Sequence, residues 1–386
     1  MKILKKLIKW FLLVLILIVV GFTVLWFFNA PKGLAKNTES YTRLNESTYS
    51  VAKIDLKIID TSRATPALGD FGGDNKRTLN GAIWFPEGDL TSRPLLIYSH
   101  GFTGEHVESS HLVEHLVRNG YVVAAVDFPL SSRRSPVKIP QLLDIANQPG
   151  DVSAVIDHLL TLNNDPKSVL HQRIDPNKIG SVGLSLGGLT TALVSFHPDL
   201  KDQRITSAVM MAPPLSAFSE RLYANNTQVR SLLLSGSLDR VVPEPANATQ
   251  VKPRNPNGWY LSLDKGTHLG FADIGNPLRW MENPDNLGCS IMNFMLSNLD
   301  LPKRWDVAIP NTDEVIRDTD VGLPCPEISG KSMNALTQQW LTRIAITAFF
   351  DMHFQSELRA KNASKFFTNT LSTENPEVSL TSPVSK

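Results

Sequence analysis

The feature that most constrains the fold is a series of short, uninterrupted apolar runs separated by longer amphipathic stretches. Strands buried on both faces of a sheet have such sequences, and they are typical of parallel sheets. The runs occupy residues 95–99, 121–126, 178–183, 205–211, 231–235 and 259–263. We therefore expect these segments to form adjacent, mostly parallel strands.

The stretches between the runs have the apolar spacing of helices. They occupy residues 107–119, 151–162, 186–196 and 244–251, and a last apolar helix is expected over residues 333–354. Two further strands are expected before the first run, in the alternating sequence from Tyr49 and over residues 78–85. Strands that alternate with helices predict an α/β fold, with a mostly parallel sheet and helices on both faces.

A different apolar segment, residues 10–28, lies near the amino terminus. It has 19 residues without a charge, which as a helix would span about 30 Å, the thickness of the hydrocarbon core. Four lysines precede it and aromatic residues lie at both ends, a pattern typical of transmembrane anchors. The positive-inside rule predicts a single-pass inner (plasma) membrane protein whose remaining residues lie on the periplasmic, extracytoplasmic side.

A cleaved signal peptide is the alternative interpretation of this segment. The run is longer than the usual apolar core of a signal peptide, and the sequence around Ala30 is a poor cleavage site. Both observations favour an uncleaved anchor. Every charged residue among the first 36 is a lysine, so the rest of a chain with net charge +1 is mildly acidic, which argues against nucleic-acid binding.

The two cysteines, Cys289 and Cys325, both lie in the part expected outside the cytoplasm. An even number of cysteines in an oxidising compartment suggests a disulfide, with two unpaired thiols as the alternative. No CxxC or Cys–His spacing indicates a zinc site. His111 and His115 have a helical spacing that can bind zinc, but no HExxH motif accompanies them, so we expect no metal site there.

The sequence GLSLGG, centred on Ser185, follows one predicted strand and opens the next predicted helix. In a G-x-S-x-G motif the serine lies on a strained strand-to-helix turn, and the glycines leave room for the backbone to reverse. The amino terminus of the helix adds a positive dipole end near the hydroxyl. This context predicts that Ser185 is a nucleophile.

A serine nucleophile needs a histidine base, which a carboxylate orients. Asp239 follows the apolar run at 231–235, and His268 follows the run at 259–263. Loops at the carboxyl ends of parallel strands lie at the same edge of the sheet. We therefore expect Ser185, Asp239 and His268 to form a triad, with Asp264 as the alternative acid and Asp127 in the pocket floor.

Two backbone N–H groups should bind the oxyanion of the reaction intermediate. One is expected from Leu186, the residue after the nucleophile. The other is expected from Phe102, in the sequence SHGFTG that follows the first apolar run. His100 in the same sequence is expected to support the loop.

These motifs resemble the α/β-hydrolase superfamily, with its chain order of serine, acid and histidine. The closer resemblance, over residues 50–355, is to bacterial dienelactone-hydrolase-like proteins related to plasma-type platelet-activating-factor acetylhydrolases. It rests on a D-x-x-R sequence at Asp60, a strand ending in Trp-Phe-Pro, and the sequences SHGFTG, DVSAVIDHL, GLSLGG and GTHLGF. Those relatives often have His and Phe where this chain has Leu184 and Leu186, and dienelactone hydrolases use Cys in place of Ser185.

The resemblance implies an α/β-hydrolase domain that cleaves carboxylic esters, either short acyl or lipid-derived, through an acyl-enzyme and without a cofactor. An amidase or peptidase with the same triad, and a non-catalytic binding protein, are the alternatives. The oligomeric state cannot be predicted from the sequence. The expected organisation is a tail and anchor (1–30), a polar stalk (31–48), the α/β-hydrolase domain (49–366) with an insertion or lid-like segment (272–332), and a disordered tail (367–386).

Overall fold

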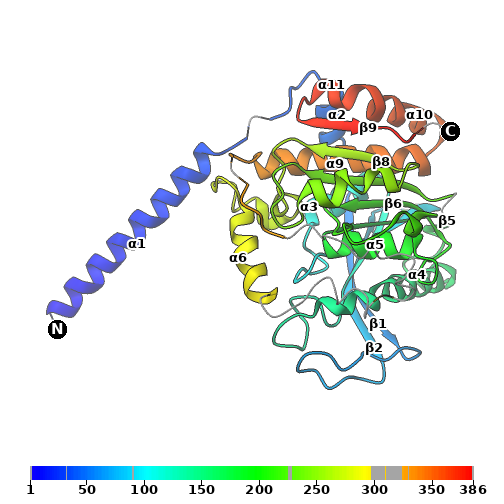
Figure 1. The fold of residues 1–386 in the computed structure, drawn as a ribbon, viewed down its shortest axis with the longest axis horizontal. Coiled ribbons are helices and arrows are strands. Elements are labelled where there is room, and N and C mark those ends of the chain that lie inside the picture. The colour runs from blue at the N-terminus through cyan, green and yellow to red at the C-terminus, as the bar shows by residue number, and fades with distance from the viewer. Residues whose placement is uncertain are drawn as a thin grey trace.

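The described part of the chain forms one nine-stranded sheet with the order β1-β2-β4-β3-β5-β6-β7-β8-β9 (Figure 1). The computed structural model describes residues 2–31, 33–88, 91–224, 228–296, 309, 324–328 and 330–384. The strands are β1 Val51–Asp60, β2 Arg77–Pro86, β3 Arg93–Ser99, β4 Val122–Asp127, β5 Ile174–Leu184, β6 Ile205–Met211, β7 Arg230–Gly236, β8 Trp259–Leu263 and β9 Val378–Thr381.

The six strands from β3 to β8 are parallel, as their uninterrupted apolar sequences predict. β1 and β2 pair antiparallel with each other, and β2 pairs antiparallel with β4. β9 pairs antiparallel with β8 at the other edge of the sheet. The predicted mostly parallel sheet is therefore confirmed, with antiparallel strands only towards its two edges.

Helices cover both faces of the sheet. The α-helices in the described residues are α1 Lys2–Phe28, α2 Glu39–Asn45, α3 Ser110–Arg118, α4 Gln148–Asn164, α5 Leu186–Phe196, α6 Asp285–Leu296, α9 Ala335–Phe354, α10 Glu357–Lys365 and α11 Leu371–Glu374. The helix expected over residues 244–251 forms only short π and 3₁₀ turns, because prolines within and beside it cannot continue a helical hydrogen-bond ladder.

Alternate residues of the central strand β3 pack into different layers of the core. Leu96 and Tyr98 face α3 and α9, while Leu95 and Ile97 face α4. A further cluster lies between α5 and the sheet and reaches the loops that follow β6. Both faces of the central strands are therefore buried, which explains why their sequences show no alternation of polar and apolar residues.

The apolar segment near the amino terminus forms the long helix α1, which projects from the domain (Figure 1). Among the described residues, only Ile3–Phe28 is long and apolar enough to cross a membrane by these two criteria. The carboxyl end of α1 contacts the domain, where the Arg279 guanidinium lies 3.6 Å from the centroid of the Trp26 ring.

The segment expected to be a polar stalk is instead partly folded against the domain. Thr38 caps α2, whose first two backbone N–H groups donate to the Glu374 carboxylate at 3.0 and 2.8 Å. Leu34 and Leu44 pack against the main core. The polar composition of residues 31–48 hid these two apolar anchors, so the expectation of a stalk was wrong.

The tail expected to be disordered is also folded, as far as Val384. After a short π turn it forms α11 and then β9, which hydrogen-bonds to β8. Phe367, Leu371 and Val378 are buried in the main core. Spaced apolar residues and a free sheet edge therefore outweigh the Ser, Thr and Pro content on which the expectation of disorder rested.

The insertion or lid-like segment, residues 272–332, is described only in part. Residues 272–296 form a 3₁₀ turn and α6, and residues 324–328 lie beside them. Residues 297–308, 310–323 and 329 lie outside the described part of the chain.

Candidate active site

Ser185 lies on the turn between β5 and α5, with φ 56° and ψ −118°. This backbone conformation is rare for a residue with a side chain. Two glycines permit the turn: a Cβ at Gly183 would lie 2.1 Å from the Gly187 carbonyl oxygen, and a Cβ at Gly187 would lie 2.0 Å from the Ser99 oxygen. The G-x-S-x-G spacing is therefore a steric requirement of the turn.

The loop after β3 packs directly against this turn, because Gly187 approaches the backbone of Ser99 and His100 so closely. The neutral His100 ring supports the loop by donating from Nδ1 to the Gly101 carbonyl at 2.7 Å and by accepting the Phe128 N–H at 3.0 Å. The contact brings Phe102 and Leu186, the two residues predicted to bind an oxyanion, to the lining of one pocket.

Asp239 and His268 lie on the loops after β7 and β8, which are neighbouring parallel strands. His268 Nδ1 donates to Asp239 Oδ2 at 2.8 Å, and Asp239 Oδ1 accepts the Val242 N–H at 2.7 Å. Both side chains are almost completely buried. The pairing fixes the tautomer of His268 and leaves Nε2 without the proton, as a general base requires.

A second carboxylate, Asp285 at the start of α6, binds the backbone of the same two loops. It accepts the backbone N–H groups of His268 at 2.8 Å, Leu269 at 2.9 Å and Arg240 at 3.1 Å. Arg240 follows Asp239 directly, so Asp285 ties the acid loop to the histidine loop. Its own side chain is fully buried.

These charges affect the protonation of the site. Burial disfavours the charged imidazole, but the nearby carboxylates of Asp239, Asp285 and Glu108 outweigh burial and raise the pKa of His268 above its usual value. Burial, followed by the charge of Asp239, raises the pKa of Asp285 to about 6. The site therefore holds its proton on His268 to a higher pH than an isolated histidine would.

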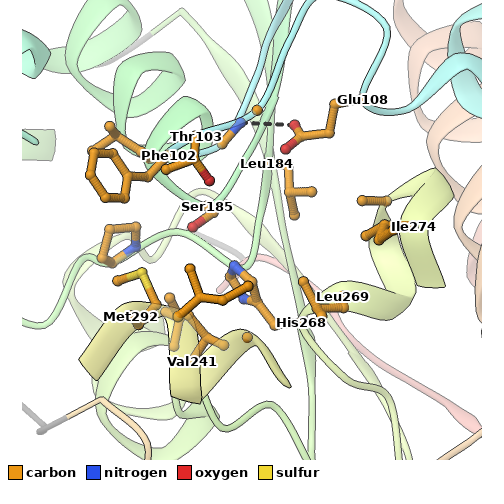
Figure 2. A pocket seen from close by; sticks show the side chains of 18 of the residues that line it. Phe102, Thr103, Glu108, Leu184, Ser185, Val241, His268, Leu269, Ile274 and Met292 are labelled. Carbon is orange, nitrogen blue, oxygen red and sulfur yellow. Dashed lines mark hydrogen bonds between the residues drawn. The ribbon is translucent and has the colours of Figure 1, made fainter. Parts of the chain in front are cut away.

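Glu108 lies at the other side of the pocket, just before α3. Its Oε2 accepts the Gly101 N–H at 2.8 Å and the Tyr98 hydroxyl at 3.0 Å, so the side chain holds the loop that carries Phe102 (Figure 2). Burial raises its pKa to about 7. A half-buried carboxylate therefore titrates near neutral pH beside Ser185.

Ser185 and His268 project into one cavity of about 700 Å³ (Figure 2). Most of its walls are apolar. They come from the loop after β3, the turn between β5 and α5, the loop after β6, the loop after Asp239 and the segment from Leu269 to α6, together with Leu142 and Pro324. The apolar residues are Phe102, Val107, Leu142, Leu184, Leu186, Pro214, Val241, Val242, Leu269, Ala272, Ile274, Pro277, Leu287, Ile291, Met292 and Pro324. A cavity of this size and lining fits a small apolar molecule beside a reactive serine.

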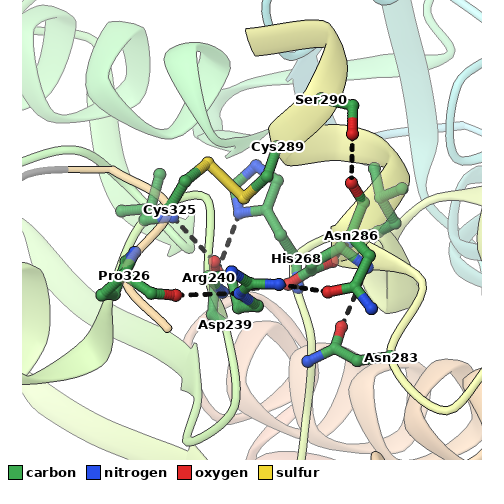
Figure 3. Close-up of a disulfide and its surroundings, with 12 residues drawn as sticks. Asp239, Arg240, His268, Asn283, Asn286, Cys289, Ser290, Cys325 and Pro326 are labelled. Atoms are coloured by element: carbon green, nitrogen blue, oxygen red, sulfur yellow. Dashed lines mark hydrogen bonds and ion pairs between the residues drawn. A yellow bond between two sulfur atoms is a disulfide. The ribbon is translucent and has the colours of Figure 1, made fainter. Parts of the chain in front are cut away.

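The disulfide, one of the two alternatives left open by the sequence, joins Cys289 on α6 to Cys325 (Figure 3). The Cys325 N–H donates to the Arg240 carbonyl at 2.6 Å, and Arg240 Nε donates to the Pro326 carbonyl at 2.9 Å. The disulfide therefore connects one wall of the cavity to the loop that carries Asp239.

No protein-family model matches the chain. Cutinase 2 of Thermobifida cellulosilytica is 27% identical over 193 residues, which are 49% of this chain and 65% of that protein. Cutinase est1 of Thermobifida alba is 27% identical over 237 residues, which are 60% of this chain and 67% of that protein. A solved structure of a ferulic acid esterase from Streptomyces cinnamoneus superposes with a TM-score of 0.52 at 19% identity and covers 86% of this chain and 96% of that one.

The chain has the α/β-hydrolase fold. This superfamily is the one that the sequence resembles, whereas the relatives do not single out the dienelactone-hydrolase-like subfamily. The chain spans 53% to 67% of the length of the curated cutinases it matches.

Three residues that the sequence offered as an alternative acid, a pocket residue and a metal ligand take no part in the Asp239–His268 pair of this α/β-hydrolase fold. Asp264 is exposed and accepts the Ser237 hydroxyl at 3.3 Å. Asp127 holds His106 through its backbone N–H and Nδ1, at 2.7 and 2.9 Å, and does not line the cavity. His111 Nδ1 pairs with Asp273 at 2.5 Å, and the described residues contain no group of three or more His, Cys, Asp or Glu that could hold a metal ion.

Asp285 and Glu108 were not predicted from the sequence as residues of the site. A helix start at Asp285 could have been inferred from the sequence NPDNLGCSIM, in which acidic and small polar residues precede an apolar stretch. No local signal shows that the Asp285 carboxylate reaches the loop of His268. Glu108 carries no motif of its own. Its bond to Gly101 and its place in the cavity wall relate it to the site, and both depend on the fold.

Proposed function

We propose that the chain is a serine hydrolase of carboxylic esters. The observation that carries the proposal is the buried Asp239–His268 pair, which opens into an apolar cavity that also holds Ser185 on a strained turn. The named cutinases and the ferulic acid esterase structure support ester chemistry.

In the proposed first half-reaction, Ser185 Oγ attacks the carbonyl carbon of the ester while His268 Nε2 takes the hydroxyl proton. Asp239 stabilises the resulting imidazolium. The backbone N–H groups of Phe102 and Leu186 bind the oxyanion, next to the amino terminus of α5. When the tetrahedral intermediate collapses, the C–O bond to the alcohol breaks, His268 donates its proton to the alcohol, and the acyl group remains on Ser185.

In the second half-reaction, water replaces the alcohol. His268 Nε2 takes a proton from the water as its oxygen attacks the acyl carbon, and the same N–H groups bind the second oxyanion. Collapse of this intermediate releases the carboxylic acid and returns the proton to Ser185 Oγ. Every proton moves between Ser185, His268, the leaving alcohol and water, so the cycle needs no cofactor.

We propose further that α1 anchors the domain to a membrane, with the domain on the extracytoplasmic side. The length of α1, the lysines that precede the apolar run and the disulfide, which suits an oxidising compartment, support this topology. A cavity with mostly apolar walls favours neutral esters with an apolar acyl group.

The test uses the full-length protein in detergent and p-nitrophenyl esters from acetate to palmitate. Ser185→Ala should lower kcat/KM by about 10⁴-fold or more. Asp239→Asn should lower it by a comparable factor, because His268 would then take the tautomer that carries the proton on Nε2. Asp264→Asn, a carboxylate near the same strand end but exposed, serves as the matched control and should remain within about twofold of the native protein.

A folded Ser185→Ala variant that keeps its activity would show that another residue is the nucleophile. A folded native protein that hydrolyses no ester of the series would overturn the ester proposal, and a parallel series of p-nitroanilides would then detect an amidase. Thermal unfolding of each variant separates loss of chemistry from loss of fold.

A further inference from the structure

Helix α6 exposes apolar side chains on the face that does not pack against the domain. Leu287, Ile291 and Phe294, spaced i, i+4 and i+7, are 42%, 44% and 78% exposed. The opposite face holds Asp285 and Cys289, which are buried and bonded to the domain. The contacts of the other face therefore leave this apolar face uncovered by the described residues.

The exposed apolar surface continues into the segment before α6. Ile274 is 51% exposed and Trp280 is 37% exposed. Ile274, Leu287 and Ile291 also line the cavity that holds Ser185. We call these five residues, Ile274, Trp280, Leu287, Ile291 and Phe294, the mouth surface, because they combine the rim of the cavity with the exposed face of α6.

The carboxyl end of α1 joins the domain beside this mouth surface. The Phe22 and Trp280 rings meet edge to face with centroids 5.3 Å apart. The buried Arg279 guanidinium stacks on the Trp26 ring and donates to the Trp26 carbonyl at 3.2 Å. Figure 1 shows α6 on the side of the domain from which α1 projects.

We propose that the mouth surface rests in the headgroup–acyl boundary of the lipid bilayer that α1 spans, so that the cavity opens onto the membrane. Amphipathic helices lie at this depth with their apolar face in the lipid, and tryptophan is enriched there. A lipid surface is the occupant that α1 brings to the mouth surface, since both are joined through Trp280 and Arg279.

The proposal also assigns a substrate class, and this part rests on the proposed ester hydrolysis. An ester dissolved in the bilayer would enter the cavity past Ile274, Leu287 and Ile291 without crossing water. Esters with long acyl chains, held in the membrane, would thus be favoured over esters in the aqueous phase.

Docking is tested without reference to activity. The full-length protein is placed in phosphatidylcholine nanodiscs that contain a phosphatidylcholine with a diazirine in its acyl chain, and photo-adducts are mapped by mass spectrometry. We expect adducts in residues 272–296 as well as in α1, and none in α10, although Leu358 on that helix is 72% exposed. Adducts confined to α1 would overturn the proposal.

Substrate entry is tested with Phe294→Asp, since Phe294 does not line the cavity, and with Leu358→Asp as the matched control. Phe294→Asp should lower the rate on p-nitrophenyl palmitate in phosphatidylcholine vesicles about tenfold and change the rate on aqueous p-nitrophenyl acetate less than twofold. Leu358→Asp should change neither rate by more than about twofold. Equal effects of Phe294→Asp on both esters would overturn entry from the membrane, whereas a native protein inactive on both would overturn the ester function and leave the photo-adduct map to decide docking.

Discussion

The serine side and the histidine side of the site are held in place by different forces. The turn of Ser185 is fixed by close backbone approach, between Gly183 and Gly187 and between Gly187 and Ser99. The loop of His268 is fixed by two buried carboxylates that lie 29 and 17 residues away in the chain. One side of the site thus depends on the absence of side-chain atoms, and the other on charges supplied by distant segments.

The largest loss of stability is expected on the serine side, at Gly187, where a Cβ atom would clash with the backbone. Gly187→Ala would place a methyl group 2.0 Å from the Ser99 carbonyl oxygen, so either the turn or the loop after β3 must move. We expect the free energy of unfolding to fall by about 4 kcal/mol or more, with loss of ester hydrolysis. Chemical denaturation and the p-nitrophenyl ester assay measure the two effects.

The matched control is Gly72→Ala, because a Cβ there meets no atom within 4 Å. It should change the free energy of unfolding by less than about 0.5 kcal/mol. If Gly187→Ala is as mild as Gly72→Ala, then the turn is not sterically fixed and the contrast between the two sides disappears.

A smaller but still large effect is expected on the histidine side. Asp285→Ala leaves the N–H groups of Arg240, His268 and Leu269 without their acceptor in a buried place. We expect a loss of about 2 to 3 kcal/mol in the free energy of unfolding, because unsatisfied buried donors are costly, and a fall in kcat. Calorimetry and steady-state kinetics provide the measurement.

Asp264→Ala is the control for this change, since Asp264 is an exposed carboxylate at the end of β8. It should affect stability by less than about 0.5 kcal/mol. Similar values for the two alanine variants would mean that Asp285 does not hold the loops, despite its three hydrogen bonds.

The smallest effect concerns the pH profile. His268 acts as a base only when neutral and its pKa is raised, so the acid limb of kcat/KM should have its midpoint above 6.5. Asp239→Asn removes the nearest of the carboxylates that raise this pKa, so the midpoint should fall to lower pH. An unchanged midpoint in Asp239→Asn would show that Asp239 does not set the protonation of His268.

The raised pKa of His268 makes stability and activity change in opposite directions with pH. Because the folded protein raises the pKa of His268, the stabilisation from its protonated form is complete below the unfolded pKa and is lost as the pH rises through the folded pKa. Activity should therefore increase over the pH range in which this contribution to stability decreases.

The two sides also differ in how far they could be predicted. The apolar runs predicted β6 and β8 with the bounds that the structure has. A strand buried on both faces is apolar along its whole length, so the run ends where the strand ends. The turn of Ser185 could be predicted because its glycines lie two residues away on either side. Asp239 and His268 could be placed because each lies on the loop that follows its own strand.

The support of the histidine side could not be predicted in this way. Nothing in the sequence around Asp285 specifies a hydrogen bond to His268, since that contact depends on how α6 is placed in three dimensions. The same reason applies to α2, α11 and β9. Their few apolar anchors, such as Leu44 and Leu371, are outnumbered by polar neighbours, so local composition suggested a stalk and a disordered tail.

The strand β9 has a consequence for the behaviour of many copies together. A parallel sheet that ended at β8 would expose a row of unpaired N–H and C=O groups, which is a template for aggregation. β9 pairs along β8, is only four residues long, and is followed by Pro383, so the new edge offers little to a neighbour. At high concentration, two molecules that meet at this edge would therefore have little free strand with which to extend the sheet from one to the other.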